Sequence, residues 1–290
     1  MGKPTQCATS VEAVRFLAAD VMEVDLRMQE PPEFHFDAGQ WVSIPFGPKT
    51  VRAYSIASTP RSPKVITLCA DVAPGGIGSK WFRALERGQP VEFKGPTGGF
   101  VFHRTDPRRV LFVAEEIGIV PIRSILTELY ETGFGRGAAL IYWGREPGWL
   151  VYDAEFRSLA RRYPSFSYFP AVRDAPAVVS SAGSAGAVVS GDARRGPPGP
   201  PSVIEAPAVP AVSSAGFAGA VVPGDARRGP PGPPSMIDKG EAAEVVDRLV
   251  HSVTGLVAYA SGGAEMINRV RAVLMAKGLD RKSVKWEKFW

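Results

Sequence analysis

The segment Arg52-Ala53-Tyr54-Ser55-Ile56-Ala57-Ser58 indicates the architecture of this chain more strongly than any other. Arg52 and Tyr54 are two residues apart, so on a β-strand their side chains lie on one face. There a guanidinium can bind a diphosphate while a phenol ring stacks on a flat aromatic group. The hydroxyl of Ser55 can donate a hydrogen bond to a ring nitrogen. Alone, the pattern also suits an ordinary barrel strand.

Two glycine-rich segments follow, PGGIGSKWF at residues 74–82 and GPTGGF at residues 95–100. Glycines let the backbone approach an anion closely, and the start of a helix favours phosphate. Each segment alone is also explained by turn glycines. In this order along a barrel, the three motifs together are much more specific than any one of them.

The first part of the chain has the pattern of short β-strands separated by Gly and Pro, which predicts an antiparallel barrel. We expect strands over residues 11–17, 21–28, 40–46, 51–57, 64–70 and 91–94, with one helix over residues 79–87. The barrel domain is expected to cover residues 1–104.

From residue 105 onward, apolar runs alternate with helical stretches, which is typical of a parallel sheet covered by helices. We expect strands over residues 108–114, 138–144, 165–172 and 256–260 and near Val284, and helices over residues 119–131, 153–163, 241–251 and 264–277. This α/β domain is expected to cover residues 105–290, interrupted by an insertion over residues 175–240.

The insertion contains 11 Gly and 12 Pro and an internal repeat. Residues 179–205 and 212–238 match at 23 of 27 positions, 33 residues apart. Its apolar residues are mainly Ala and Val, which bury little area against the entropy of ordering. We interpret it as a disordered loop, with a proline-rich docking segment as the alternative.

Composition excludes several classes of protein. Two cysteines, Cys7 and Cys69, and three scattered histidines provide no metal or iron–sulfur cluster. No apolar run of about 18 residues predicts a membrane span, and residues 1–16 lack a signal pattern, so the expected location is the cytoplasm. The net charge of +5 is diffuse, without the basic and aromatic clusters of nucleic-acid binders.

The three motifs resemble those of the ferredoxin–NADP+ reductase superfamily, over residues 10–174 and 241–290. The resemblance implies a six-stranded antiparallel Greek-key FAD-binding barrel followed by a Rossmann-like parallel α/β nucleotide-binding domain. It implies that Arg52 would bind the FAD diphosphate, that Tyr54 would stack on the isoalloxazine ring and that Ser55 would lie near the flavin N5. The residues that complete the diphosphate cradle would be Gly76, Gly78 and Ser79.

The loop for the pyridine nucleotide departs from the family. Where relatives carry GGTGIAP, this chain has Glu115-Glu116-Ile117-Gly118-Ile119-Val120-Pro121, so Gly118 and Pro121 match and the leading glycines are glutamates. One interpretation is that both carboxylates point to water and cap the helix. The other is that they repel the nucleotide, at about 4 kcal/mol for each like-charge pair before relaxation and screening. NAD(P)H would then bind weakly or only after the loop moves.

The remaining assignments also come from the resemblance. Contacts with NADPH or NADH would be made by Gly144, Arg145, Arg173, Gly262 and Met266, and Ser261 stands where relatives often have Cys. In the C-terminal segment, Glu287 would balance protons near N5, while Phe289 or Trp290 would shield the flavin. The expected catalytic residues are thus Ser55, Ser261 and Glu287, with no metal.

The expected function is FAD-dependent transfer of a hydride from NAD(P)H, with electrons passed to a separate ferredoxin, flavodoxin or oxygenase component. Two alternatives stay open. One is a flavin-binding sensor or fixed relay whose nicotinamide site is blocked, and the other is an interaction protein that recruits a partner through the repeats. The sequence does not distinguish NADPH from NADH, nor does it identify the acceptor or the oligomeric state.

Overall fold

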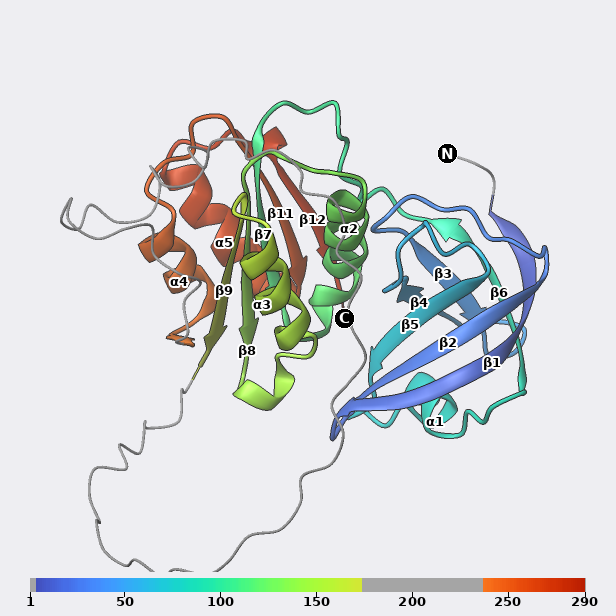
Figure 1. Cartoon of the computed structure of the whole chain (residues 1–290). Coiled ribbons are helices and arrows are strands. Elements are labelled where there is room, and N and C mark those ends of the chain that lie inside the picture. The colour runs from blue at the N-terminus through green and yellow to red at the C-terminus, as the bar shows by residue number, and fades with distance from the viewer. Residues whose placement is uncertain (1–3, 174–236, 290) are drawn as a thin grey trace, which may run out of the picture. The chain divides into compact units, whose positions relative to one another are not determined.

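The computed structural model describes residues 4–173 and 237–289, which belong to one compact unit. It contains two six-stranded sheets, one antiparallel and one parallel, formed by successive parts of the chain (Figure 1). The predicted fold class is therefore confirmed. The predicted boundary at residue 104 falls between the last strand of the first sheet and the first strand of the second.

The first sheet is an antiparallel barrel. Its strands are β1 (Thr5–Ala18), β2 (Val21–Glu30), β3 (Trp41–Pro45), β4 (Val51–Ser55), β5 (Val65–Asp71) and β6 (Pro90–Thr97), in the order β4-β3-β6-β1-β2-β5. A bridge between Ile56, just after β4, and Leu68 in β5 links the two ends of the order. Helix α1 (Ile77–Arg83) lies between β5 and β6, and its Phe82 is buried in the barrel core.

The second sheet is parallel. Its strands are β7 (Arg109–Glu115), β8 (Ala138–Gly144), β9 (Phe166–Val172), β10 (Asp238–Lys239), β11 (Leu256–Gly262) and β12 (Val284–Lys288), in the order β10-β9-β8-β7-β11-β12. All seven residues of β8 and of β11 are buried, as expected for strands covered on both faces. Three 3-10 turns lie at Glu116–Gly118, Pro147–Trp149 and Arg281–Ser283.

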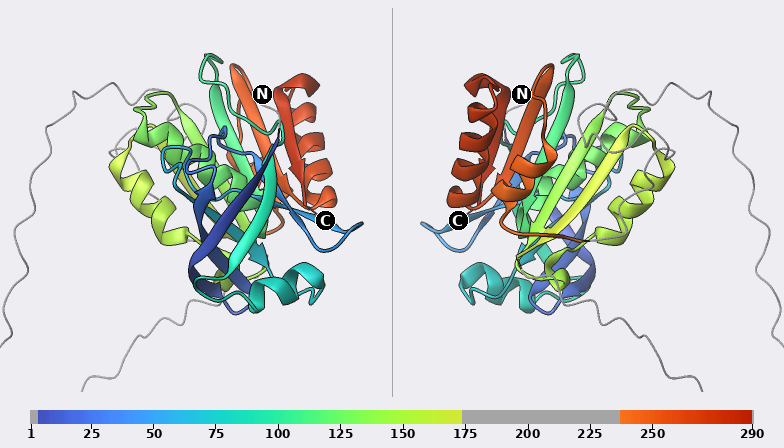
Figure 2. Two further views of the ribbon diagram at one scale, coloured as in Figure 1. Left: turned by 90° about the vertical axis from the view of Figure 1, so that its right-hand side faces the viewer. Right: turned by 90° about the vertical axis from the view of Figure 1, so that its left-hand side faces the viewer.

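Four helices cover this sheet, two on each face (Figures 1 and 2). They are α2 (Ile119–Glu131), α3 (Asp153–Arg162), α4 (Ala242–Leu249) and α5 (Ala264–Ala276). Alternation along β7 separates the two faces: Val110 and Phe112 pack in the core with α2 and α3, whereas Leu111 packs with α4 and α5. The first of these cores also contains Ala57 and Cys69 from the barrel part of the chain, so apolar packing joins the two sheets.

The largest differences from the predicted elements lie at the start of β1 and in the insertion. In addition, α1 ends at Arg83, four residues earlier than expected. Strand β1 begins at Thr5, six residues earlier than expected, because its first half pairs with β6. Asp238 and Lys239, expected within the insertion, form β10 beside Ala171 and Val172 of β9. Residues 174–236, which contain most of the predicted insertion, lie outside the described residues, and so does the prediction that it is a disordered loop.

In the part of the chain that the structure describes, no helix has the length and apolar character needed to cross a membrane.

Candidate functional site

The structure brings together the first two motifs of the barrel. Arg52 and Tyr54 lie in β4, while Gly76 is the N-cap of α1, followed by Gly78 and the buried Ser79. A Cβ atom added to Gly78 would lie 2.3 Å from Tyr54 Oη and 3.9 Å from Arg52 Cγ. Only glycine allows this close approach, so the absence of a side chain at position 78 sets the contact between loop and strand.

Tyr54 offers a neutral aromatic surface. Its half-buried ring packs against Phe82 and Trp81, with centroid distances of 5.2 Å and 6.0 Å. Burial raises the pKa of Tyr54 to about 12, although the charge of Arg52 lowers it. The phenol therefore keeps its proton at physiological pH, and the ring is held in place by its aromatic neighbours.

The guanidinium of Arg52 is exposed and donates a hydrogen bond to the carbonyl of its neighbour Val51 at 3.1 Å. Within residues 4–173 and 237–289, no carboxylate forms an ion pair with it. A guanidinium without a carboxylate, beside a glycine loop and an aromatic ring, fits a diphosphate attached to a flat ring system. The residues present thus fit FAD at this place.

The three residues expected to be catalytic lie near one another. Ser55 is 4% exposed at the end of β4, and its side chain is near enough to Glu287 to lower the pKa of that carboxyl group. Glu287 in β12 is the register partner of Ser261 in β11. The hydroxyl of Ser261 is fully buried and has no hydrogen-bond partner among the described residues, so its capacity is left for a ligand.

Glu287 has a perturbed acidity. Burial raises its pKa from 4.5 to about 7, and the side chain of Ser55 lowers it in part. The carboxyl group therefore changes protonation near neutral pH, which suits a group that exchanges protons with a reaction.

This shift predicts a pH dependence of stability. The folded state binds the proton of Glu287 more tightly than the unfolded state does. The contribution of this protonation to the free energy of unfolding is therefore complete below pH 4.5 and is lost as pH rises through about 7. The loss is of order ~3 kcal/mol at most. We expect Glu287→Gln to flatten this part of the profile, measured by urea unfolding between pH 4.5 and 8.5 at equal flavin loading. Parallel profiles for the two proteins would contradict the assignment.

The predicted nucleotide loop lies where β7 meets α2. Gly118 is buried against the end of β11, since an added Cβ would lie 2.3 Å from the carbonyl oxygen of Ser261. Pro121 is buried in the first turn of α2. Gly144 ends β8 and is also tightly packed, with Glu146, Trp149 and Leu150 all 3.3 Å from an added Cβ.

Glu115 and Glu116 do not point to water, nor do they cap α2, so that interpretation is wrong. Glu116 is 6% exposed and binds Arg145, with Nε–Oε1 and Nη2–Oε2 distances of 2.7 and 2.6 Å. Glu115 accepts a hydrogen bond from the backbone N–H of Gly263 at 2.6 Å. Neither side chain makes a capping hydrogen bond at the start of α2. Both carboxylates instead bind donors on neighbouring strand ends.

The other predicted nucleotide residues have partners within the chain. Arg173 pairs with Glu241 at 3.0 Å, and its guanidinium lies 5.2 Å from the Trp143 ring centroid. Gly262 has φ +154° beside Glu115, and Met266 is 6% exposed in the core under α5.

Of the two aromatic residues expected to shield the flavin, Phe289 packs against the core that joins the sheets, and its N–H donates to the carbonyl of Gly262 at 3.0 Å. Trp290 lies outside the described residues.

The sequence analysis assigned no role to three residues that join the barrel to α2 and α3. Ser124 donates to the carbonyl of Ser58 at 2.6 Å, and Arg123 donates to that of Ala57 at 3.0 Å. Tyr152, with φ +65°, donates to Glu23 at 2.6 Å. The first two contacts hold the start of α2 against the chain just after β4, and the third holds the start of α3 against β2. The adjacent Arg-Ser pair after Pro121 was the available signal, but its partners are 66 residues away.

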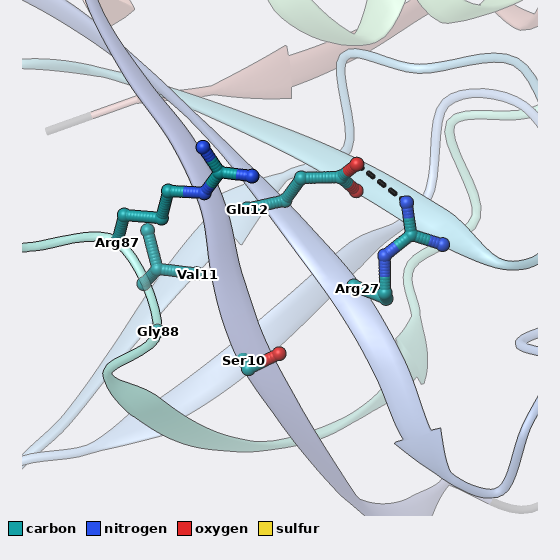
Figure 3. A pocket seen from close by; sticks show the side chains of 6 residues that line it. All are labelled: Ser10, Val11, Glu12, Arg27, Arg87 and Gly88. Carbon is teal, nitrogen blue, oxygen red and sulfur yellow. Dashed lines mark hydrogen bonds and ion pairs between the residues drawn. The ribbon is translucent and has the colours of Figure 1, made fainter.

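A shallow hollow of about 310 Å³ lies elsewhere on the barrel (Figure 3). It is lined by Ser10, Val11, Glu12, Arg27, Arg87 and Gly88. Arg27 forms an ion pair with Glu12 across it. None of its lining residues belongs to the motifs, so we assign it no role.

The family described as "Oxidoreductase FAD-binding domain" matches residues 8–102, which contain Arg52, Tyr54 and Gly78. Ferredoxin–NADP reductase B of Sorangium cellulosum (strain So ce56) is 34% identical over 152 residues, covering 51% of this chain and 62% of that protein. Reductase component 1 of terephthalate 1,2-dioxygenase from Comamonas sp. is 31% identical over 157 residues, covering 54% and 47%. Residues 8–102 thus match an FAD-binding oxidoreductase domain, and about half of this chain is similar to a ferredoxin–NADP reductase and to a dioxygenase reductase component.

Solved structures are similar to this chain at the level of the fold. The Amycolatopsis cytochrome P450 reductase GcoB has a TM-score of 0.73 at 20% identity, over 99% of this chain and 70% of that one. A ferredoxin NADP+ reductase from Neisseria gonorrhoeae, solved with FAD and NADP, has a TM-score of 0.65 at 15% identity over the full length of both chains. The chain matches less than two thirds of the length of either curated relative above.

Proposed function

We propose that this chain is a member of the ferredoxin–NADP+ reductase superfamily and an FAD-dependent oxidoreductase. It would take a hydride from NADPH or NADH and pass electrons to a separate protein. The observation that carries the proposal is the contact of Gly78 with Tyr54 beside Arg52, whose guanidinium has no carboxylate partner among the described residues. The match of residues 8–102 to an FAD-binding domain supports it.

Arg52 is proposed to bind the diphosphate of FAD by charge-assisted hydrogen bonds, with the backbone at Gly76 and Gly78 and the residue Ser79 alongside. Tyr54 orients the ring system, since its own ring is held by Phe82 and Trp81. When bound, FAD supplies the hydride and one-electron chemistry. Phe289, and Trp290 beyond the described residues, are proposed to exclude water from the ring.

Proton balance is assigned to Ser55 and Glu287. The side chain of Ser55 lowers the pKa of Glu287, which burial raises to about 7, so a carboxyl group that titrates near neutral pH lies near a buried hydroxyl. Glu287 can thus hold or release a proton near neutral pH, and Ser55 Oγ can relay it. The unpartnered hydroxyl of Ser261 is proposed to contact the nicotinamide.

The nucleotide is assigned to the carboxyl ends of the parallel strands, where open α/β sheets bind ligands. The assigned residues are Gly118, Pro121, Gly144, Arg145, Arg173, Gly262 and Met266. Their placement at the ends of β7, β8, β9 and β11 supports the assignment. A soluble cytoplasmic location remains a proposal.

The proposed acceptor is a ferredoxin, a flavodoxin or an oxygenase component. The support is the names of the similar proteins, which include a ferredoxin–NADP reductase and a dioxygenase reductase component. The net charge of +5 favours an acidic acceptor.

The experiment is an absorbance spectrum of the purified protein, followed by anaerobic mixing with NADPH or NADH. We expect a yellow protein whose visible flavin band bleaches at sufficiently high nucleotide concentration. A colourless protein that does not take up added FAD would refute the function. A flavin band that never bleaches would favour the blocked flavin-binding protein instead, an alternative raised by the contacts of Glu115 and Glu116.

A further inference from the structure

Both arginines assigned to the nucleotide, Arg145 and Arg173, already bind a carboxylate of this chain, and so does the N–H of Gly263 beside the assigned Gly262. Arg145 holds Glu116 in bidentate geometry, and its backbone N–H donates to the same Glu116 Oε1 at 3.2 Å. The N–H of Gly263, at the start of α5, holds Glu115. Arg173 pairs with Glu241. In the barrel, by contrast, Arg52 forms no ion pair with a carboxylate among the described residues.

The geometry of Glu116 shows that its pair with Arg145 is more than a surface ion pair. Glu116 has φ +46°, a backbone conformation that costs a non-glycine residue free energy and is kept when contacts compensate. Its side chain is 8% exposed. Arg145 is positioned as well, because its guanidinium lies 3.9 Å from the centroid of the Trp149 ring.

The carboxylates also lie close enough to affect one another. Burial raises the pKa of Glu115, the N–H of Gly263 lowers it, and the charges of Glu116 and Glu241 raise it further. Arg173 lowers the same pKa. Acidic side chains therefore bind Arg145, Arg173 and the N–H of Gly263 at the carboxyl end of the parallel sheet. These three donors would otherwise be available to a phosphate.

We infer that Glu115 and Glu116 are an intramolecular competitor for the pyridine nucleotide: their carboxylates bind the Gly263 N–H and Arg145 in its place, and the nucleotide enters only by displacing them. The inference rests on the proposed function and adds a control of its substrate site. Competition differs from simple repulsion because the two carboxylates occupy specific donors. When the carboxylates leave, the Gly263 N–H and the Arg145 guanidinium become free to bind the nucleotide.

The test is calorimetric titration of the FAD-loaded full chain with NADP+, which needs no turnover. We expect Glu115→Ala/Glu116→Gly to bind NADP+ at least tenfold more tightly than the unchanged chain, and glycine suits the positive φ at position 116. Glu265→Gln is the matched control. It removes a negative charge from the first turn of the same α5, where Glu265 pairs with Arg269 rather than with Gly263.

A second comparison checks the competition itself. In an Arg145→Ala background, the same double substitution is expected to give a clearly smaller gain, because the guanidinium that it frees is missing. A gain no larger than that of Glu265→Gln would overturn the inference, and so would an equal gain in both backgrounds. Thermal unfolding of each variant confirms folding. Failure of the proposed function would be seen separately, as the absence of flavin absorbance, and titration of the flavin-free chain would still measure nucleotide affinity.

Discussion

Replacing Arg52 with alanine is expected to weaken FAD binding by about 100-fold. The substitution removes a guanidinium that no carboxylate binds among the described residues and that the Gly78 loop lies beside. A bidentate, charge-assisted contact with a diphosphate contributes about 3 kcal/mol, which corresponds to this factor. The measurement is the dissociation constant of FAD, from flavin fluorescence during titration of the flavin-free chain.

Arg61→Ala is a suitable control, since it removes an exposed arginine of the barrel outside the three motifs. Arg52→Lys is expected to fall between the unchanged chain and Arg52→Ala, because an ammonium group keeps the charge but not the bidentate geometry. If Arg52→Ala binds FAD as tightly as Arg61→Ala, the diphosphate is held elsewhere and the assignment of the site is wrong.

Gly118→Ala is expected to destabilise the fold by about 3 kcal/mol or more. The new Cβ would lie 2.3 Å from the oxygen and 2.6 Å from the carbon of the Ser261 carbonyl group. Both are backbone atoms of a buried strand, so they cannot move aside as a flexible side chain does, and overpacking of this kind is costly. The measurement is the free energy of unfolding in urea.

Gly135→Ala serves as the reference for this substitution. Nothing lies within 4 Å of an added Cβ at Gly135, so it reports the effect of a methyl group without a clash. We expect it to change stability by less than about 1 kcal/mol. A Gly118→Ala variant as stable as Gly135→Ala would show that the ends of β7 and β11 are not packed as described.

The elements were predictable because local pattern and tertiary environment agree. The apolar runs of β7, β8 and β11 are buried on both faces, and α2 and α5 lie within one residue of their predicted ranges. The proximity of Gly78 to Tyr54 also agrees with the sequence analysis. There, the strand motif with Arg52 and the glycine-rich segment at residues 74–82 were both expected to bind the same diphosphate. The assigned ligand roles remain predictions.

Other features depend on distant pairing and were not predictable. Thr5–Ser10 becomes strand because it pairs with the residues of β6, about 85 positions away. The direction of Glu116 depends on Arg145, 29 residues later, and on a positive φ that no local rule assigns to glutamate. Strand β10 has two residues, too few for a periodic pattern, and is strand only because β9 lies beside it.

The place of β10 also bears on how the gene can change. Residues 174–236, the 63 positions between the described parts, connect two parallel neighbours in which Ala171 faces Asp238. Such a connection needs about a dozen residues. Loss of one 33-residue copy would leave 30, and gain of another would only lengthen it. A change in the number of copies therefore alters only the length of this connection, and every strand can keep its neighbour.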